Sequence, residues 1–265
     1  MTLRSLHDRS SLADRFGGDP TMHVMELGDL DDLLWPHTSW YTVSESGPVA
    51  LLYSVGDIPT LLAFSRPGQA AELEDLAEAL LPVLPRRFFG HTTGEVGKVF
   101  RRAYEEQPHG TLLRMALTDP DRVPPASGPW RPAPLGRAEL PELLALFDEA
   151  YPGNWFDPRM LDTGQYVGAR RDGRLVAVAG VHVYSAAYRV AAIGNVATLP
   201  EARGRGAAEA CVAALCRQLG KSVDHIGLNV RADNATAVRL YRRLGFSEVT
   251  EFSEGVFTAL AQPLP

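Results

Sequence analysis

Apolar residues recur at helical spacing between residues 207 and 220, directly after a short apolar run that is typical of a strand. The run, residues 190–197, is rich in small and β-branched side chains. Pro200 cannot donate to a β-ladder, so we expect the strand to end near Leu199. The helix should end at Gly220. The pattern predicts a strand, a glycine-rich loop and a helix in that order.

The same pattern recurs about thirty residues later. Residues 225–230 predict a second buried strand, and Asn234 stands where the next helix needs an N-cap. Tyr241 follows Asn234 by about two helical turns, so both side chains point along one side of that helix, which Gly245 ends. Tyr241 is therefore either a core tyrosine or a phenol beside the glycine-rich loop.

The remaining apolar pattern divides the chain into two halves with parallel element orders. The second half begins with an expected strand at 130–135, a helix at 140–150 and a hairpin of 165–170 and 174–185 that turns at Asp172-Gly173. In the first half we expect a hairpin of 50–55 and 60–64, a helix at 73–84, a strand at 87–91, a helix at 96–106 and a strand at 111–118.

A proline-rich stretch marks the boundary between the halves. Six prolines fall between residues 119 and 134, which is typical of an extended linker. The first half then reads as a diverged copy of the second. Its residues 92–97 stand at the expected loop position but carry an acid, Glu95, so we expect no coenzyme there. The predicted units are a polar tail (1–22), a first module (23–118), a linker (119–129) and a second domain (130–265).

Composition narrows the class of protein. The net charge of −6 and a pI near 5.7 leave no basic surface for a nucleic-acid backbone. The first 20 residues are too polar for a signal peptide, and no apolar run reaches the roughly 20 residues of a membrane span, so we expect a cytoplasmic protein. Cys211 and Cys216 are five apart on one predicted helix, which splays their side chains and favours packing roles. No cluster has metal-ligand spacing, so no metal is expected.

The loop before the first of the two helices has the character of an anion site. Gly204 and Gly206 permit backbone conformations that bring successive N–H groups together. The helix N-terminus adds partial positive charge, and Arg203 and Arg205 add full charges. An ordinary strand-to-helix connection would have the same elements, so the loop alone does not establish an anion site.

Two ordered motifs resemble the GNAT superfamily of acyl-CoA-dependent N-acyltransferases. The family's pyrophosphate loop reads Arg/Gln-x-x-Gly-x-Gly/Ala, and its second signature reads Asn-x-x-Ala-x-x-x-Tyr followed by Gly-Phe. The sequences of residues 193–198 and 151–156 are most similar to those of the glycine N-acyltransferase branch. The matching positions are Arg203, Gly206 and Ala208 in the first motif, and Asn234, Ala237, Tyr241, Gly245 and Phe246 in the second.

The resemblance implies an α/β fold with a mixed, mostly antiparallel sheet whose central strands are splayed, preceded by a second, degenerate GNAT-like domain. Acetyl-CoA or another acyl-CoA would be the co-substrate, its pantetheine arm pairing with the strand before the loop and its pyrophosphate meeting the loop. The implied coenzyme contacts are Val196, Ala197, Thr198, Arg203, Gly204, Arg205, Gly206, Ala207, Ala208, Asn229, Asn234, Ala237 and Tyr241.

The resemblance also assigns chemistry. Tyr241 matches the tyrosine that protonates the leaving sulfur. Many relatives carry a glutamate base on the strand before the loop, where this chain has Asn195, which can orient a water or the amine but cannot accept a proton. His182, Tyr184 and Glu201 are alternative bases, as is a chain of waters.

The acceptor site is expected around the loop that follows the helix at 140–150. Asp148 and Asp157 could pair with a cationic amine there, and Arg159 with a carboxylate. An aromatic loop that packs against its own domain is the alternative. The expected substrate contacts are Tyr151, Asn154, Trp155, Phe156 and Tyr184.

The function that follows is an N-acetyltransferase that moves an acetyl group from acetyl-CoA to the primary amine of a small molecule by direct attack in a ternary complex. The expected protein is a monomer or homodimer without nucleic-acid or membrane partners. Two alternatives stay open: a non-catalytic acyl-CoA sensor or scaffold, and a GNAT fold that uses the thioester for another reaction.

Overall fold

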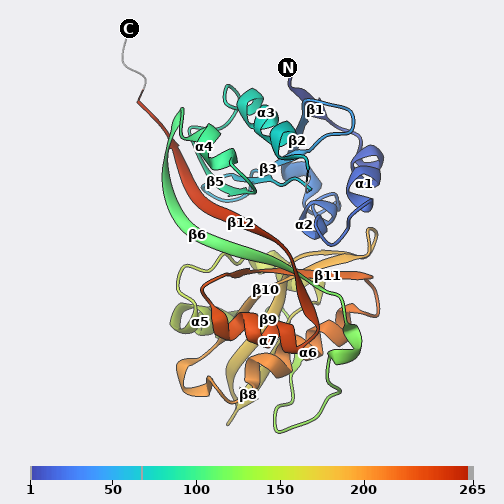
Figure 1. The fold of residues 1–265 in the computed structure, drawn as a ribbon. Coiled ribbons are helices and arrows are strands. Elements are labelled where there is room, and N and C mark those ends of the chain that lie inside the picture. The colour runs from blue at the N-terminus through green and yellow to red at the C-terminus, as the bar shows by residue number, and fades with distance from the viewer. Residues whose placement is uncertain (1, 67, 262–265) are drawn as a thin grey trace.

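The computed structural model describes residues 2–66 and 68–261. Within them, twelve strands form one continuous sheet in the order β1-β2-β3-β4-β5-β12-β6-β11-β10-β9-β8-β7. The first half of the chain lies at one end of this sheet and the second half at the other, and the long strands β6 and β12 cross between them (Figure 1).

Regular elements cover most of the first half, including residues expected to be a tail. They are β1 (Arg4–Leu6), α1 (Arg9–Gly17), α2 (Val24–Gly28), η1 (Trp35–His37), β2 (Thr38–Thr42), β3 (Ala50–Tyr53), β4 (Thr60–Ala63), α3 (Ala70–Leu80), β5 (Arg87–Thr92), α4 (Val96–Phe100) and β6 (Tyr104–Leu117).

The second half follows after a short 3-10 turn. Its elements are η2 (Pro120–Arg122), β7 (Ala133–Pro134), η3 (Arg137–Glu139), α5 (Leu140–Ala150), η4 (Pro158–Thr163), β8 (Val167–Arg171), β9 (Arg174–Ser185), β10 (Val190–Thr198), η5 (Pro200–Ala202), α6 (Ala207–Leu219), β11 (His225–Arg231), α7 (Ala235–Arg243) and β12 (Phe246–Ala259).

The two halves repeat one topology. In each, four strands pair antiparallel in chain order and the fifth pairs parallel with the fourth: β1 to β5 in the first half and β7 to β11 in the second. A helix joins the fourth strand to the fifth, and another joins the fifth to the sixth. The loop equivalent to residues 199–206 is therefore the connection from β4 to α3, and the expectation that residues 92–97 fill this position is wrong, because they lie between β5 and α4.

The sixth strands are exchanged between the halves. β12 lies between β5 and β6, whereas β6 lies between β11 and β12. The two strands pair antiparallel from Phe246 opposite Leu117 to Ala259 opposite Tyr104. In each half, the sixth strand of the other half therefore pairs with the fifth strand: β12 with β5, and β6 with β11. The proline-rich segment connects two halves that share one sheet.

A shared core reinforces the exchange. Helix α2 of the first half packs on β9 and β10 of the second, where Val183, Val190 and Ala192 join its buried side chains. Gly28 permits this approach, since a Cβ atom there would lie 1.7 Å from Cγ1 of Val183. The other two cores lie under α3 and α4 and around α5, α6 and α7.

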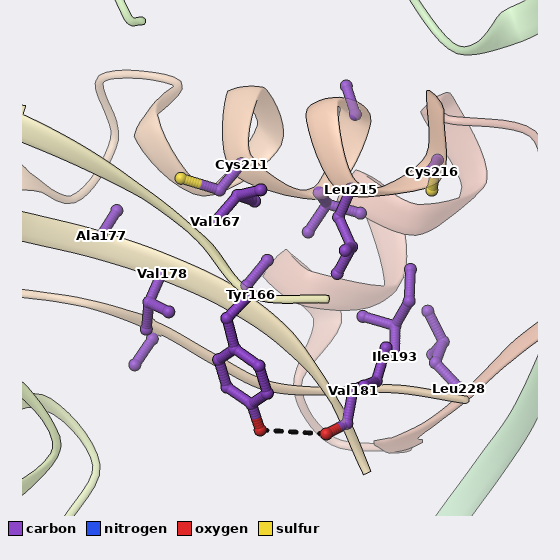
Figure 2. Packing of buried hydrophobic residues seen from close by; sticks show 14 of the residues in the cluster. Tyr166, Val167, Ala177, Val178, Val181, Ile193, Cys211, Leu215, Cys216 and Leu228 are labelled. Carbon is purple, nitrogen blue, oxygen red and sulfur yellow. Dashed lines mark hydrogen bonds between the residues drawn. The ribbon is translucent and has the colours of Figure 1, made fainter. Parts of the chain in front are cut away.

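Buried packing explains the cysteines. In Figure 2, Cys211 and Cys216 stand far apart on α6, and Leu215 between them points toward the strands. Both thiols are free and buried, and burial raises the pKa of each to about 12. They fill space in the core, as expected from their spacing.

Several local predictions are confirmed. Asp172 and Gly173 both have positive φ (50° and 82°), as a tight hairpin turn between β8 and β9 requires. Asn234 caps α7, because its side chain accepts a hydrogen bond from the Ala237 N–H at 3.1 Å. Helix α5 has the predicted bounds, and α6 begins at the predicted loop.

Three local predictions are wrong. The tail expected at 1–22 contains β1 and α1, because the side chain of Asp8 caps α1 and Leu12 and Phe16 are buried; residue 1 lies outside the described residues. The helix expected at 96–106 ends at Phe100, since the following residues pair with β12 as strand. The strand expected at 130–135 is reduced to two residues, in a segment whose prolines donate no ladder hydrogen bonds.

A buried ionic cluster lies where the halves meet. Arg114 on β6 is 2 % exposed and contacts Glu26 on α2, with Nη1 3.2 Å from Oε2. Its Nε donates to Oδ1 of Asn229 on β11 at 3.3 Å, and its guanidinium stacks over Phe64 at 4.0 Å. Burial alone would raise the pKa of Glu26, but Arg114 and His23 outweigh it and lower the pKa to about 2. One arginine thus joins α2, β6 and β11.

Removing the arginine should destabilise the whole chain. A buried ion pair that loses one partner leaves an uncompensated charge, which costs about 3–5 kcal/mol. Arg114→Met should lower the free energy of unfolding by that amount in urea titrations. Arg102→Met, which breaks an exposed pair with Glu78, should cost less than about 0.5 kcal/mol. Equal losses in the two variants would contradict a central role for Arg114.

Asp29 should give the stability a distinctive pH dependence. Burial and the charge of Glu26 raise the pKa of Asp29 well above its ordinary value, against the opposing effect of Arg114. The folded state therefore binds this proton more tightly than the unfolded state, so its contribution to stability falls as the pH rises above about 4. In urea titrations, the free energy of unfolding of Asp29→Asn should increase relative to that of the wild-type protein as the pH rises. A constant difference would contradict this assignment.

Candidate active site

The parallel strands β10 and β11 separate to leave an opening in the sheet. They pair only from Val190 opposite His225 to Ile193 opposite Leu228. Beyond this point β11 continues along β6 as far as Arg231, while β10 continues along β9 as far as Thr198. Among residues 2–66 and 68–261, no strand therefore pairs with the backbone of β10 after Ile193 on its β11 side.

A β-bulge shapes the β10 side of this opening. Gly194 pairs with Gly180 but Ala197 pairs with Val178, and Asn195 between them has φ of 53°. Asn195 is buried, and its Nδ2 donates to the hydroxyl oxygen of Tyr166 at 2.8 Å. That hydroxyl donates in turn to the Val181 carbonyl at 2.9 Å, the dashed line in Figure 2.

Asn195 is thus engaged in holding the bulge. The sequence reasoning missed Tyr166, because an aromatic residue beside a strand gives no sign that its hydroxyl will meet a residue twenty-nine positions away.

The loop after β10 presents free backbone donors. In the part of the chain that the structure describes, the N–H groups of residues 204–208 donate no hydrogen bond. Gly204 and Gly206 have positive φ (69° and 79°), and no atom lies within 4 Å of the position of a Cβ on either. Gly206 is the N-cap of α6. Free donors at a helix N-terminus suit a phosphate group.

The arginines of this loop have different surroundings. Arg203 uses its guanidinium on backbone, donating from Nε to the Thr198 carbonyl at 3.1 Å and from Nη2 to the Ala150 carbonyl at 3.3 Å. It therefore ties the end of β10 to the end of α5. Arg205 is exposed, and its carbonyl accepts from the Trp130 indole at 2.7 Å. The cradle is built mainly of backbone, and a pyrophosphate fits its donors.

Tyr241 lies on α7 and is 7 % exposed. Burial raises its pKa well above the ordinary value, and nearby Tyr151 and Cys216 add to the effect. The phenol therefore keeps its proton at neutral pH, as a proton donor must. Its hydroxyl makes no hydrogen bond to the described residues, so it remains available to a ligand.

The remaining predicted coenzyme contacts have mixed roles. Asn234 serves as the cap of α7, and Asn229 accepts from Arg114. The hydroxyl of Thr198 is buried and has no partner among the described residues. Val196, Ala197 and Thr198 form the free edge of β10, Ala207 and Ala208 begin α6, and Ala237 packs against the core.

The predicted acceptor loop divides into core and surface residues. Phe156 is partly buried and packs against the core, with its ring centroid 5.1 Å from that of Phe147 and 5.8 Å from that of Tyr166. Tyr151 is 49 % exposed, and the side-chain amide of Asn154 is buried without a partner in the described chain. Trp155, 45 % exposed, is the residue that reaches the first half.

Trp155 contributes to a small cavity between the halves. Its ring meets Tyr53 edge-on at 6.3 Å and His182 at 5.7 Å. Leu33 and Leu34 line the cavity from the first half, and Tyr184 lines it from the second, its hydroxyl 3.1 Å from Oγ of Ser222. The predicted acceptor region therefore lies beside a cavity that both halves line.

The charged candidates at this cavity neutralise each other or face solvent. Asp157 and Arg159 form an ion pair at 2.6 Å, so neither is a free charge. Glu201 pairs with Arg174 at the surface. Desolvation lowers the pKa of His182, which nearby Asn195 partly opposes, so His182 is neutral at pH 7 and able to accept a proton.

Neither a metal site nor a membrane span is found in the described residues. No three His, Cys, Asp or Glu side chains gather closely enough there to hold an ion. No described helix has both the length and the apolar character to cross a bilayer.

The model of the acetyltransferase (GNAT) family matches residues 133–246. The second half of the chain is therefore similar to a GNAT domain. Its mixed α/β fold with a mostly antiparallel sheet is the predicted one. A mycothiol acetyltransferase from Mycobacterium avium is 31% identical over 207 residues, which cover 67% of this chain and 64% of that protein. The chain spans between about a third and two thirds of the curated relatives it matches.

Two solved structures share the fold over nearly the whole chain. A Drosophila protein is 18% identical with a TM-score of 0.70, covering 97% of this chain and 98% of its own. A tandem GNAT protein from the clavulanic acid biosynthesis pathway is 14% identical with a TM-score of 0.57, covering 99% and 100%. At these identities the likeness concerns the fold alone.

A side chain at Gly206 should weaken acyl-CoA binding. Gly206→Val introduces a β-branched residue at positive φ and fills the open cradle. Loss of one or two hydrogen bonds to a charged phosphate costs about 1.5–3 kcal/mol, so we expect about a 10- to 100-fold rise in the Kd of CoA by calorimetry. Gly56→Val is the matched control, since Gly56 also has positive φ and open space but lies in a first-half hairpin. Equal affinity of the two variants for CoA would exclude residues 204–208 as the pyrophosphate site.

Proposed function

We propose that this protein transfers an acetyl group from acetyl-CoA to the primary amine of a small molecule, by direct attack in a ternary complex. The opening between β10 and β11 carries the proposal, because the free edge of β10 leads to a loop whose N–H groups donate to no described residue. Tyr241 on α7 is the proton donor in this proposal. The GNAT family match and the acetyltransferase names of relatives support it.

The free edge of β10 suits an amide chain such as the pantetheine arm. An extended ligand can add to a strand through backbone hydrogen bonds. Residues 196–198 would hold the arm, and the N–H groups of residues 204–208 would hold the pyrophosphate. Bound acyl-CoA supplies the activated thioester carbonyl. A backbone N–H of residues 195–197 would donate to its oxygen as negative charge develops there.

The reaction needs the amine nitrogen to bond to the thioester carbon while the carbon–sulfur bond breaks. Holding both reactants in one opening can supply on the order of 7–11 kcal/mol of the barrier. Tyr241 gives its proton to the leaving sulfur, and its raised pKa keeps that proton in place until the sulfur becomes basic. Asn195 positions the bulge through Tyr166, and His182 is one candidate for the proton that the amine loses.

The first half contributes to the acceptor site in this proposal. Its repeated topology supports a degenerate GNAT-like module, and Tyr53, Leu33 and Leu34 close one side of the acceptor cavity. A cavity shared by two halves suits a small molecule better than a protein tail. We also propose Tyr151, Asn154 and Tyr184 as acceptor contacts, with Trp155 at the centre. The sequence of residues 193–198 supports assignment to the glycine N-acyltransferase branch of the superfamily.

Tyr241→Phe should separate catalysis from binding. Loss of a general acid lowers kcat by about 100- to 10,000-fold, while the Kd of acetyl-CoA should stay within about twofold, because the phenol meets the sulfur only as it leaves. Thiol release in the presence of an amine measures kcat, and calorimetry measures the Kd of acetyl-CoA.

Tyr104→Phe is the control for this variant. Tyr104 is a buried tyrosine of the first half whose hydroxyl donates to the Leu84 carbonyl, and its loss should leave kcat unchanged. A Tyr241→Phe protein with the kcat of wild type would remove Tyr241 from its role.

A further inference from the structure

A histidine–glutamate pair lies on the part of the sheet that faces the second half. Nε2 of His91 on β5 is 3.0 Å from Oε1 of Glu254 on β12, and the two residues are direct cross-strand partners. Their side chains are 16 % and 17 % exposed. Nothing in the GNAT signatures accounts for this pair, which comes from the first half and from the exchanged strand.

The alternation of β5 shows which way His91 points. Phe88 is fully buried in the core under α3 and α4. Successive side chains of a strand point to opposite faces, so Phe89 and His91 face away from those helices. The ring of His91 lies 5.3 Å from that of Phe252, which belongs to the core shared with β9 and β10. His91 therefore faces the core that α1 and α2 share with β9 and β10.

The register places Glu254 beside the open end of β11. Asn229, Arg114 and Thr250 form one row across β11, β6 and β12 and share a face. Glu254 lies four residues beyond Thr250 and is on the same face, opposite Gly110 of β6.

Arg231 at the end of β11 passes over that glycine. Its Nη2 lies 3.3 Å from the position of a Cβ on Gly110, and its Nη1 donates to the His109 carbonyl at 2.6 Å. Glu254 therefore lies near Arg231 at the end of β11, five residues along β6 from the point where β10 and β11 separate.

Electrostatic effects connect the pair with the predicted site. Burial, and secondarily the charge of Glu254, raise the pKa of Tyr151, against the effect of Arg231. Desolvation lowers the pKa of His182, and His91 adds a smaller lowering effect. Both of these residues belong to the proposed acceptor region.

The hydrogen bond leaves one nitrogen of His91 free. In the neutral ring Nε2 carries the proton and donates it to Glu254, so Nδ1 holds a lone pair. Nδ1 is buried and has no hydrogen-bond partner in the described chain. The carboxylate oxygens and the free ring nitrogen are hydrogen-bond acceptors, so an aliphatic ammonium ion is the ligand that the pair favours.

We propose that the His91–Glu254 pair accepts the proton that the acceptor amine loses. The ammonium group of the acceptor binds Glu254, and its proton passes to the pair. The freed electron pair on nitrogen forms the bond to the thioester carbon, the carbon–sulfur bond breaks, and the sulfur takes the proton of Tyr241. The nitrogen, positively charged after the attack, gives its second proton to solvent water, and the Tyr241 phenolate takes a proton from solvent. The acceptor is thus an aliphatic amine that is cationic at neutral pH. This inference rests on the proposed function.

Isosteric variants of the full-length chain test the pair. With an aliphatic amine at pH 7, Glu254→Gln and His91→Gln should each lower kcat/KM by about 100- to 10,000-fold, and the Kd of acetyl-CoA should stay within about twofold. Glu251→Gln on the same strand is the control, since Glu251 is exposed and lies on the opposite face. With an aromatic amine, which is neutral at pH 7, the loss should shrink to less than about tenfold, because no proton need be removed before attack.

A pH profile distinguishes the pair from His182. The charges of Tyr151 and Arg231 interact with Glu254, and that of His182 interacts with His91. The acid limb of kcat/KM should disappear in His91→Gln and persist in His182→Gln. Loss of the limb in His182→Gln alone, or equal losses with aliphatic and aromatic amines, would overturn the proposal.

The outcomes also separate this inference from the function it rests on. Amine-dependent thiol release that both variants leave unchanged would overturn only the role of the pair. Failure of the wild-type protein to acetylate any amine would remove both proposals.

Discussion

The pairing of β6 with β12 is the interaction on which the rest of the structure depends. The two fourteen-residue strands run antiparallel along their whole length, and each also completes the sheet of the opposite half. Separating the halves would expose the ladder hydrogen bonds on both sides of each strand, and buried backbone groups without partners are costly. The chain therefore folds around a shared centre, which the Arg114–Glu26 pair and the packing of α2 on β9 and β10 reinforce.

This centre positions the candidate site. β11 is held by β6 on one side, so it stays in the sheet where β10 bends away at the Asn195 bulge. The acceptor cavity and the His91–Glu254 pair exist because the first half is fixed against the second. The first half repeats the topology of the second, and its residues line one side of the cavity between them and include His91.

Local signals in the sequence predicted much of the fold and of the coenzyme side. The Asp172-Gly173 turn, the Asn234 cap and the Gly206 helix start each follow from a few adjacent residues. Strand exchange does not, because the polar residues 104–109 become a strand only by pairing with β12. The Asn195–Tyr166 bond and the His91–Glu254 pair join residues 29 and 163 positions apart. Single-sequence periodicity contains no register information at those distances, so these contacts could not be predicted from it.

The most direct test is the reaction of the wild-type protein with acetyl-CoA and a panel of small amines, amino acids and aminoglycosides, with free thiol and product mass recorded together. The account predicts thiol release that depends on one class of cationic amine, and a product heavier than that amine by one acetyl group. Tight binding of acetyl-CoA without amine-dependent release across the panel would contradict it and favour a sensor that kept the coenzyme site.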